Sequence, residues 1–513
     1  MIINFIKKSK NYVCMNCNLS LSRRYLSISL SYILVFFSLL LISCAYKKDS
    51  IVIAYPQAPR SFDCHVRKEL ITLSILYNIY EPLVCFDANM KIGPGLADYW
   101  EQKDSLTWVF YLRDDVVFHN GKTCGINDVI YSLYRPMNLP ESEFTVLQDV
   151  LDTIIGEVEN KIIIKTIIPR TFVLYDVALI GIIPEGLDPG TEDPVGTGPY
   201  RFIASSENRL TLEAFPQYWG EKPEIKRVDY YIIPEFEGRF QMFAEGKADI
   251  ITFVPIEAVE RCEAIGQVVA SPGVSIRYLE LNLRKYPFNT REFRFAINIG
   301  IDREGMTRDV YHGYAVPANQ YINPGVFGYD PTRKNFVYDP DSAKKLILNL
   351  GDVPAIELEY ANVKYFIGEA IAKQLENIGL KVKTHSLPPD EFWARIEGRQ
   401  SDCYLISMVP NSYEGIGDIT SCFHTLQSAK GLGLQNRVGF SNRRVDAIIE
   451  SLPYITDPQH VAQKISEIQD ILIKDLPTIP IVWEKQIYCV SEKIEWDLRL
   501  DEFILIRDIT ITD

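Results

Sequence analysis

Strands and helices alternate along this chain, and this alternation limits most strongly how it can fold. Residues 225–233 have the apolar pattern of a strand, 236–244 that of a helix that ends near Gly246, and 249–254 that of a second strand. A strand–helix–strand unit places its two strands in parallel within one sheet. The sequence therefore predicts an α/β protein built on mostly parallel sheets.

A second run of the same kind follows about a hundred residues later. Asp339 supplies an N-cap for a helix that continues to Gly351, and a strand is expected at 356–360. A helix at 367–378 then leads to a strand at 380–384, where apolar and polar residues alternate. We expect a second α/β lobe from this pattern.

The chain has 513 residues, which is too long for a single hydrophobic core, so two or three domains are expected. Short strands at 107–112 and 161–167 predict an added subdomain within the first lobe, over roughly residues 84–200. Ser/Gly-rich linkers are absent from the sequence, so the lobes should be joined by short ordered strands.

Residues 1–43 have the composition of a secretory leader. They carry five basic residues and no acidic ones, with an apolar stretch at 26–42. Leu41-Ile42-Ser43-Cys44 then has the form of a bacterial lipobox, which predicts cleavage before Cys44 and a lipid on its thiol. An uncleaved membrane anchor is the alternative, and Met15 is a second candidate for the start.

The net charge of the chain is −14, and the body that follows the basic leader is more acidic still. An acidic body is repelled by nucleic acid and by anionic lipid, so we expect no nucleic-acid partner. It would be held at the bilayer through the acyl chains on Cys44.

Cysteine and histidine usage argues against a metal centre and against catalysis. Enzyme motifs such as GxSxG, HExxH and the phosphate-binding GxxxxGK[ST] are absent, and the six histidines are dispersed. Cys422 and His424 lie close together in sequence but lack a third partner. We therefore expect no enzyme, no metal and no cofactor.

One or two disulfides are compatible with an oxidising compartment, and buried free thiols are the alternative for seven cysteines outside the leader and lipobox: Cys64, Cys85, Cys124, Cys262, Cys403, Cys422 and Cys489.

Five stretches occur in the order typical of one protein family. The most specific runs from Gly95 (GLADYW) through Leu106 (LTWVFYLRD) and Val117 (VFHNGK) to Asn127 (NDVIYS). The others are IYEPLV at 79–84, PVGTGPY at 194–200, LNL with FN, RFAIN and IDR over 281–303, and IPIV at 479–482. Together they resemble the peptide and nickel family of extracytoplasmic solute-binding proteins that feed ABC importers.

Each of these motifs also has a structural reading. Asn120-Gly121 is typical of a hairpin turn, and Asp302 suits the start of a helix. Gly196 and Gly198 are expected to supply the backbone angles of a tight loop that enters a strand. The shared motifs therefore speak mainly for the fold.

The resemblance implies a two-lobe clamp of the type II periplasmic-binding-protein fold, with an extra subdomain in the first lobe. Lobe I would cover 44–277, lobe II would cover 278–480, and 481–513 would return to lobe I. Two strands near 278–282 and 479–483 would cross between the lobes. We expect a monomer that faces the extracytoplasmic space, closes on a solute and delivers it to a membrane permease.

The resemblance also suggests ligand residues. Asn411 matches an Asp that holds the ammonium group of peptides in the family, and Glu414 or Asp418 is a possible substitute. Lys364 lies where dipeptide binders carry an Arg for the peptide carboxylate. Tyr278, Asn282, Met408 and Tyr413 are placed in the cleft by the resemblance, and Gln57, Pro59 and Arg60 follow the first strand, at 51–55.

At both positions that would anchor a peptide, this chain differs from the family: Asn411 is neutral where the family has an Asp, and Lys364 stands in place of an Arg. The identity of the ligand therefore stays open. Peptides lead, including longer or cell-wall-derived ones, and a chelated metal or another small solute is the alternative. A hydrolase of cell-wall peptides would need a nucleophile–base pair, which the sequence does not offer. An adhesive or signalling lipoprotein is the remaining rival.

Overall fold

A computed structural model of the chain describes residues 49–512, apart from 145, 146, 149, 191, 192, 272, 274 and 410–412. The predicted leader, Cys44 and Asn411 lie outside the described residues. Within the described part, no helix combines the length and the apolar character that crossing a membrane requires.

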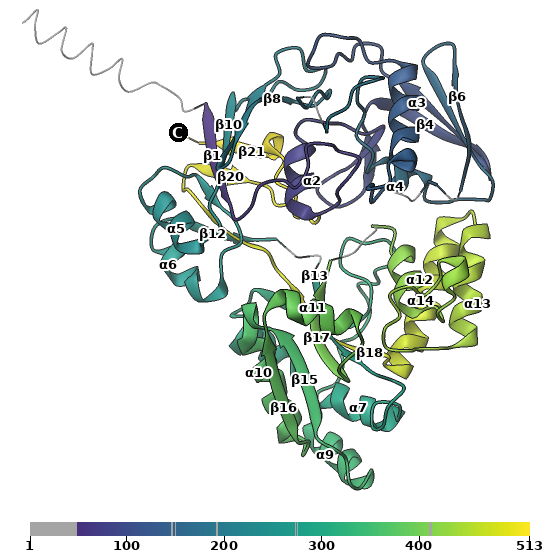
Figure 1. The fold of residues 1–513 in the computed structure, drawn as a ribbon, viewed down its shortest axis with the longest axis vertical. Helices are drawn as coiled ribbons and strands as arrows, with labels where there is room; N and C mark the ends of the chain where they lie inside the picture. Colours follow the sequence, from purple (N-terminus) through teal and green to yellow (C-terminus); the bar gives the residue numbers. More distant parts are fainter. Residues whose placement is uncertain are drawn as a thin grey trace, which may run out of the picture. The chain divides into compact units, whose positions relative to one another are not determined.

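The first main sheet has seven strands in the order β12-β19-β11-β1-β10-β9-β8. Strand β1 (Ser50–Tyr55) lies beside β10 (Arg227–Ile232) in Figure 1, pairs with β11 (Ile250–Ile251) on its other side, and is parallel to both. Helix α5 (Phe236–Ala244) connects β10 to β11, which confirms the predicted strand–helix–strand unit. The second strand is shorter than predicted because Phe253, with a φ of 53°, leaves the extended conformation.

Two antiparallel strands extend this first sheet at each of its edges, and short helices pack on its faces. They are α2 (Leu70–Leu76), β8 (Tyr200–Ser206), β9 (Arg209–Ala214), α6 (Val259–Glu263), β12 (Gln267–Ala270) and β19 (Ile487–Val490). Two small two-stranded sheets complete the region: β2 (Val84–Phe86) with β3 (Ile92–Pro94), and β20 (Ile494–Trp496) with β21 (Ile509–Ile511).

An antiparallel sheet in the order β4-β5-β7-β6 forms the added subdomain. Its strands are β4 (Ala97–Asp104), β5 (Thr107–Leu112), β6 (Leu151–Glu157) and β7 (Lys161–Thr166). Helix α3 (Ile126–Tyr134) packs on β6 and β7, and α4 (Val173–Val177) contributes to the same hydrophobic cluster. Phe110, Ile162 and Ile164 are fully buried in that cluster, so this sheet has a core of its own.

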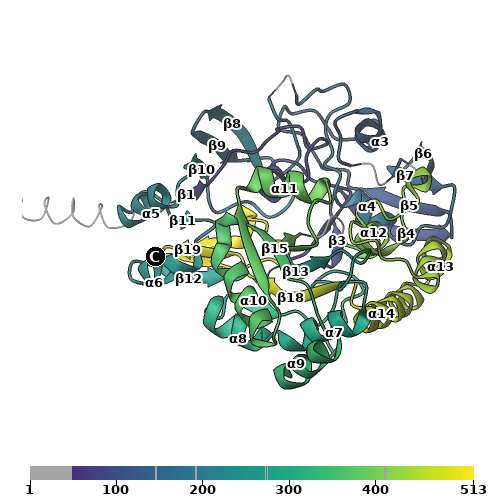
Figure 2. The same ribbon diagram turned by 60° about the horizontal axis from the view of Figure 1, so that its bottom comes forward.

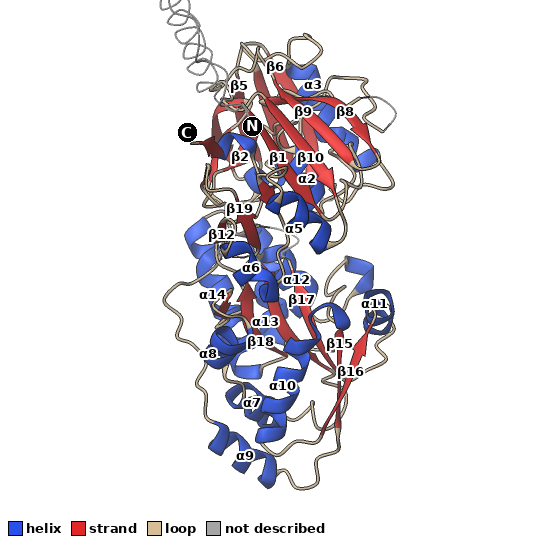
Figure 3. Cartoon of the chain, turned by 90° about the vertical axis from the view of Figure 1, so that its left-hand side faces the viewer, coloured by secondary structure: helices blue, strands red, loops and turns tan. Residues whose placement is uncertain are grey.

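The second main sheet has six strands in the order β14-β18-β13-β17-β15-β16. Its strands are β13 (Ser275–Leu281), β14 (Ala315–Pro317), β15 (Ile356–Ala361), β16 (Val382–Leu387), β17 (Cys403–Met408) and β18 (Thr478–Glu484). Strand β15 is parallel to β16 and β17, whereas β13 is antiparallel to β17 and β18. Strand β16 forms one edge of the sheet (Figure 3).

In this second lobe the helix predicted after Asp339 starts at the expected residue, and the helix predicted at 367–378 starts two residues earlier, at Tyr365. The Asp339 side chain caps α9 (Pro340–Asn349) by accepting the Ser342 N–H at 2.9 Å. Helix α10 (Tyr365–Asn377) packs on β15 and β16 (Figure 1). The others are α7 (Arg291–Gly300), α8 (Arg303–Gly305), α11 (Pro389–Glu397), α12 (Ile416–Phe423), α13 (Arg443–Ser451) and α14 (Pro458–Asp475).

The chain passes between the two main sheets twice. Strand β12 ends at Ala270 in the first sheet and β13 begins at Ser275 in the second. Strand β18 ends at Glu484 in the second sheet and β19 begins at Ile487 in the first. Two short neighbouring connections therefore join the lobes.

Gly196 and Gly198 serve a different purpose from the one that the sequence suggests. Neither has a positive φ. A Cβ on Gly196 would lie 2.1 Å from the carbonyl oxygen of Ile79, and a Cβ on Gly198 would lie 2.6 Å from that of Asn78. These glycines allow a close approach between two backbone segments, which the Gly198 N–H to Ile79 oxygen bond of 2.8 Å then holds.

Candidate functional site

The carboxyl ends of several strands meet around one cavity. Strands β15, β17 and β18 run in the same direction, and Lys364 and Glu484 lie at their carboxyl edge. The segment after β11 in the first sheet faces the same space. Ligands in α/β folds commonly bind at such edges. The cavity has a volume of about 270 Å³ and is lined by Phe253–Glu257, Tyr311, Tyr314, Val363, Lys364, Phe366 and Glu484–Ile487.

Glu484, which lines this cavity, belongs to a buried ion pair. Arg277 on β13 donates two hydrogen bonds to the carboxylate of Glu484, at 3.1 and 2.8 Å, and both side chains are about nine-tenths buried. The hydroxyls of Tyr311 and Ser407 donate to the same carboxylate, at 2.9 and 3.0 Å. The paired geometry is the strong, bidentate form of an arginine–carboxylate contact.

The charge state of this cluster follows from its surroundings. Burial by itself would raise the pKa of Glu484, but the charges of Arg277 and Lys364 outweigh it and hold that pKa at about 2. Glu484 is therefore ionised at neutral pH.

Lys364 gives the cavity a surplus of positive charge. Its Nζ lies 3.4 Å from Glu484, and its side chain remains 44% exposed. Arg277 already neutralises Glu484, so two cations face one carboxylate. Lys485 and the exposed Glu257 in the same lining offset one another. An anionic group of a solute could therefore bind at Lys364.

A smaller cavity of about 40 Å³ lies on the other face of β13. Tyr278 and Met408 line it, and the Tyr278 hydroxyl lies 3.8 Å from the Met408 sulfur. Glu280 and Arg437 form a second ion pair at its wall, at 3.0 Å. Apolar and charged groups thus alternate around this cavity as well.

Comparisons with known proteins agree with this geometry. The profile of the Bacterial extracellular solute-binding proteins, family 5 Middle matches residues 91–430, which is most of the chain. The chain belongs to the bacterial extracellular solute-binding proteins of family 5.

Relatives of this solute-binding protein span nearly its whole length. The glutathione-binding protein GsiB of Salmonella paratyphi A is 24% identical over 475 residues, which cover 88% of this chain and 92% of GsiB. DppA from Helicobacter pylori, an ABC transporter-associated periplasmic binding protein in complex with the peptide STSA, has a TM-score of 0.74 at 20% identity and covers 90% of this chain and 98% of DppA. NikA from Brucella suis, in complex with Fe(III)-EDTA, has a TM-score of 0.79 at 20% identity, and the match covers 90% of this chain and 100% of NikA.

The family match confirms the resemblance that the motifs indicate, and the structural likeness confirms the two-lobe type II fold with mixed α/β content. This protein is thus an extracytoplasmic solute-binding protein. Its relatives are binding proteins rather than enzymes.

The edge of the second sheet in this solute-binding protein also exposes apolar side chains. Val363 and Tyr365 follow β15, Trp393 lies on α11 after β16, and Val409 follows β17. All four are at least 44% exposed. Large exposed apolar groups gathered beside a cavity are typical of a binding surface.

The three residues predicted after the first strand lie at the carboxyl end of β1. Gln57 and Arg60 are exposed, and Pro59 is half-buried. The Arg60 N–H donates to the Thr72 hydroxyl at 2.9 Å. They lie at the carboxyl edge of the first sheet, where ligands commonly bind in α/β folds, but they do not line the cavity of about 270 Å³.

Tyr413 and Glu414 contact the first lobe. The Tyr413 ring packs edge-on against Phe86, with centroids 5.3 Å apart. Glu414 is buried, and its charge acts on Arg170 and Lys68. The structure therefore separates these two residues from Tyr278 and Met408.

Asn282 lies at the opposite end of β13 from the cavity. Leu281 pairs with Cys403 and Ile276 pairs with Met408, so Asn282 is close to the start of β17. Its amide donates to Asp402 at 3.1 Å. Of the predicted residues, the structure brings together Tyr278 with Met408, and it places Lys364 in the larger cavity.

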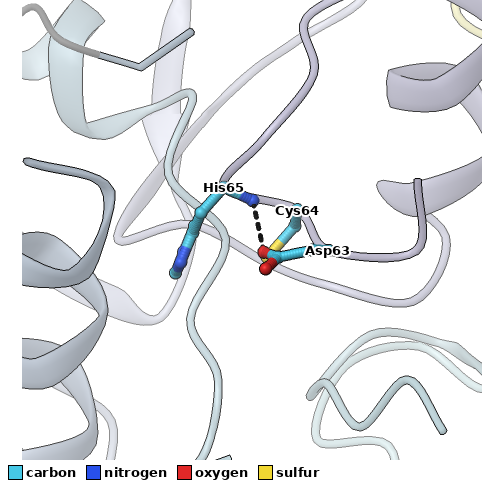
Figure 4. Close-up of side chains that lie close together, drawn as sticks. All are labelled: Asp63, Cys64 and His65. Carbon is cyan, nitrogen blue, oxygen red and sulfur yellow. Dashed lines mark hydrogen bonds between the residues drawn. The ribbon is translucent and has the colours of Figure 1, made fainter. Parts of the chain in front are cut away.

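In the part of the chain that the structure describes, one group of candidate metal ligands lies close together: Asp63, Cys64 and His65 (Figure 4). Arg135 occupies this group, because it donates to both carboxylate oxygens of Asp63 at 2.8 and 2.6 Å. It also lies 3.2 Å from Nδ1 of His65, whose Nε2 is 2.8 Å from the Gly181 oxygen. Asp63 and His65 are thus engaged with the guanidinium, and the Cys64 thiol donates to the Gly181 oxygen, so the group is a structural ion pair.

Arg277, Glu484 and Phe253 are site residues that the sequence analysis missed. Glu484 had a signal, because it is a single acidic residue that ends the apolar strand TIPIVWE. Its partner Arg277 is far away in sequence. The left-handed backbone of Phe253 has no sequence signal, since residues other than glycine rarely adopt it.

Proposed function

We propose that this protein captures peptides in the cleft between its lobes and delivers them to the permease as a monomer tethered by a lipid on Cys44. The observation that carries the peptide proposal is the cavity of about 270 Å³, to which both lobes contribute. Lys364 would bind the peptide carboxylate, and the exposed apolar groups around Tyr365 and Trp393 would contact apolar side chains. Peptide ligands in the relatives' printed names, the STSA tetrapeptide and glutathione, are consistent with this proposal.

Replacing Lys364 should weaken binding of acidic ligands selectively. Lys364→Ala should lower the affinity for a peptide with a free C-terminus about 10-fold or more, because a charge-assisted hydrogen bond contributes roughly 1.5–3 kcal/mol. The same peptide with an amidated C-terminus should lose much less. Titration calorimetry measures both.

Lys373→Ala is the matched control, since Lys373 is an exposed lysine further along α10. It should bind both peptides like the wild type. Equal losses for the free and the amidated peptide in Lys364→Ala would contradict the assignment of Lys364.

The second candidate is a chelated metal or another small anionic solute in the same cavity. The surplus positive charge at Lys364 would suit an anionic chelate equally well, and NikA was solved with Fe(III)-EDTA. A calorimetric panel of peptides against metal chelates separates the two. Binding of chelates alone would replace the peptide proposal.

The lipid tether is tested separately. Cys44→Ser should release most of the protein from the membrane fraction into the soluble extracytoplasmic fraction, because the acyl chains supply the membrane affinity. Labelling with a fatty-acid analogue and fractionation measure this. Unchanged membrane retention of the unlabelled variant would point to an uncleaved anchor instead.

A further inference from the structure

Two buried cysteines from distant parts of the chain lie against each other in the first lobe. Cys262 belongs to α6 and Cys489 to β19, and neither is exposed to solvent. Both are free thiols in the structure, and the Cys489 sulfur lies 3.8 Å from the backbone oxygen of Cys262. The two side chains also belong to one hydrophobic cluster, so the thiols are close neighbours, as the formation of a disulfide requires.

The contact follows from the register of β19. Alternate residues of this strand face opposite sides of the sheet, and Ile487 and Cys489 point into the hydrophobic cluster that also contains Cys262. Tyr488 and Val490 point to the opposite side and join a different cluster. Strand β12 pairs with β19, and α6 packs on β12, which keeps α6 beside Cys489 (Figure 2).

The position of this pair along the chain gives it a role. Every strand of the second main sheet lies between residues 262 and 489. Strand β12 leaves the first sheet after Cys262, and β19 re-enters it at Ile487, immediately before Cys489. A bond between the two sulfurs would therefore enclose the whole second lobe in one covalent loop, closed where the chain leaves and re-enters the first sheet.

We infer that Cys262 and Cys489 form a disulfide in the exported protein. Each thiol loses a proton, the two sulfurs form one bond, and the two electrons reduce the disulfide of an exchange protein or of a small-molecule disulfide to two thiols. Extracytoplasmic compartments supply such oxidants. Because both cysteines are buried in the folded protein, the bond forms during folding, before α6 and β19 are packed together.

Mass spectrometry of the full-length protein tests the bond directly. Protein isolated from the extracytoplasmic fraction is denatured and alkylated without reductant, and then digested. We expect a cross-linked peptide containing Cys262 and Cys489, and two more alkylated thiols once the sample is reduced first. Alkylation of both residues without prior reduction, or a bond to any other cysteine, would overturn the inference.

Thermal unfolding provides a second test, because the unfolding midpoint would not respond to reductant if the two thiols were only packed together. Reductant should lower the unfolding midpoint of the wild type by about 5 °C, because a bond that closes a long loop restricts the unfolded chain. Cys262→Ala and Cys489→Ala should each lose this sensitivity to reductant, whatever their own midpoints. Cys403→Ala, which removes a buried thiol of the second sheet, should keep it. Neither measurement involves a ligand, so the result is independent of the proposed peptide binding.

Discussion

Glu484→Ala should destabilise the protein by about 3–5 kcal/mol, since removal of one partner of a buried ion pair leaves the other charge uncompensated. Arg277 would remain nine-tenths buried beside Lys364 with no carboxylate between them. The hydroxyls of Tyr311 and Ser407 would lose their common acceptor as well. Urea unfolding at pH 7 measures the change in free energy.

A double variant distinguishes a charge effect from a simple loss of packing. Arg277→Met combined with Glu484→Leu removes both charges and retains much of the volume, so it should recover most of the loss. Glu257→Ala removes an exposed carboxylate from the lining of the same cavity and should change stability by less than about 0.5 kcal/mol. If Glu484→Ala unfolds like the wild type, the ion pair does not stabilise the protein.

Acidification from pH 6.5 to pH 4 should destabilise the protein through its buried histidines. Burial, with the charge of Arg135 acting in the same direction, lowers the pKa of His65 to about 4. The unfolded chain binds a proton at His65 below about pH 6.5, whereas the native state does not until about pH 4. Stability therefore falls with pH across this window, by up to about 3 kcal/mol for this residue. The loss follows from the structure, because Nδ1 of His65 lies beside the Arg135 guanidinium.

Urea unfolding at a series of pH values measures this slope, which should approach about 1.4 kcal/mol per pH unit for each such histidine. His65→Gln should reduce the slope but not abolish it, because burial also lowers the pKa of His119 to about 4. A slope in His65→Gln equal to that of the wild type would show that His65 is not the titrating group.

The candidate site was only partly predictable from the sequence. Lys364 could be named because the family resemblance places an anchoring cation at this position, before the helix of the second lobe, and the structure puts it in the cavity. Asn282 comes from an equally clear motif, but β13 runs antiparallel to β17 and carries it to the far edge. The direction of a strand within its sheet depends on partners that are remote in the chain, so a local motif cannot reveal it.

Local patterns by themselves determined the α/β class and several element bounds, such as helix α5 at Phe236–Ala244 and strand β5 at Thr107–Leu112. Periodicity and capping depend on neighbouring residues, and for that reason they can be read from the sequence. Only the tertiary structure decided that Arg277 meets Glu484 and that Cys262 meets Cys489. Those contacts arise from the pairing of strands that are far apart in the chain, and burial of the two lobes' cores selects that pairing.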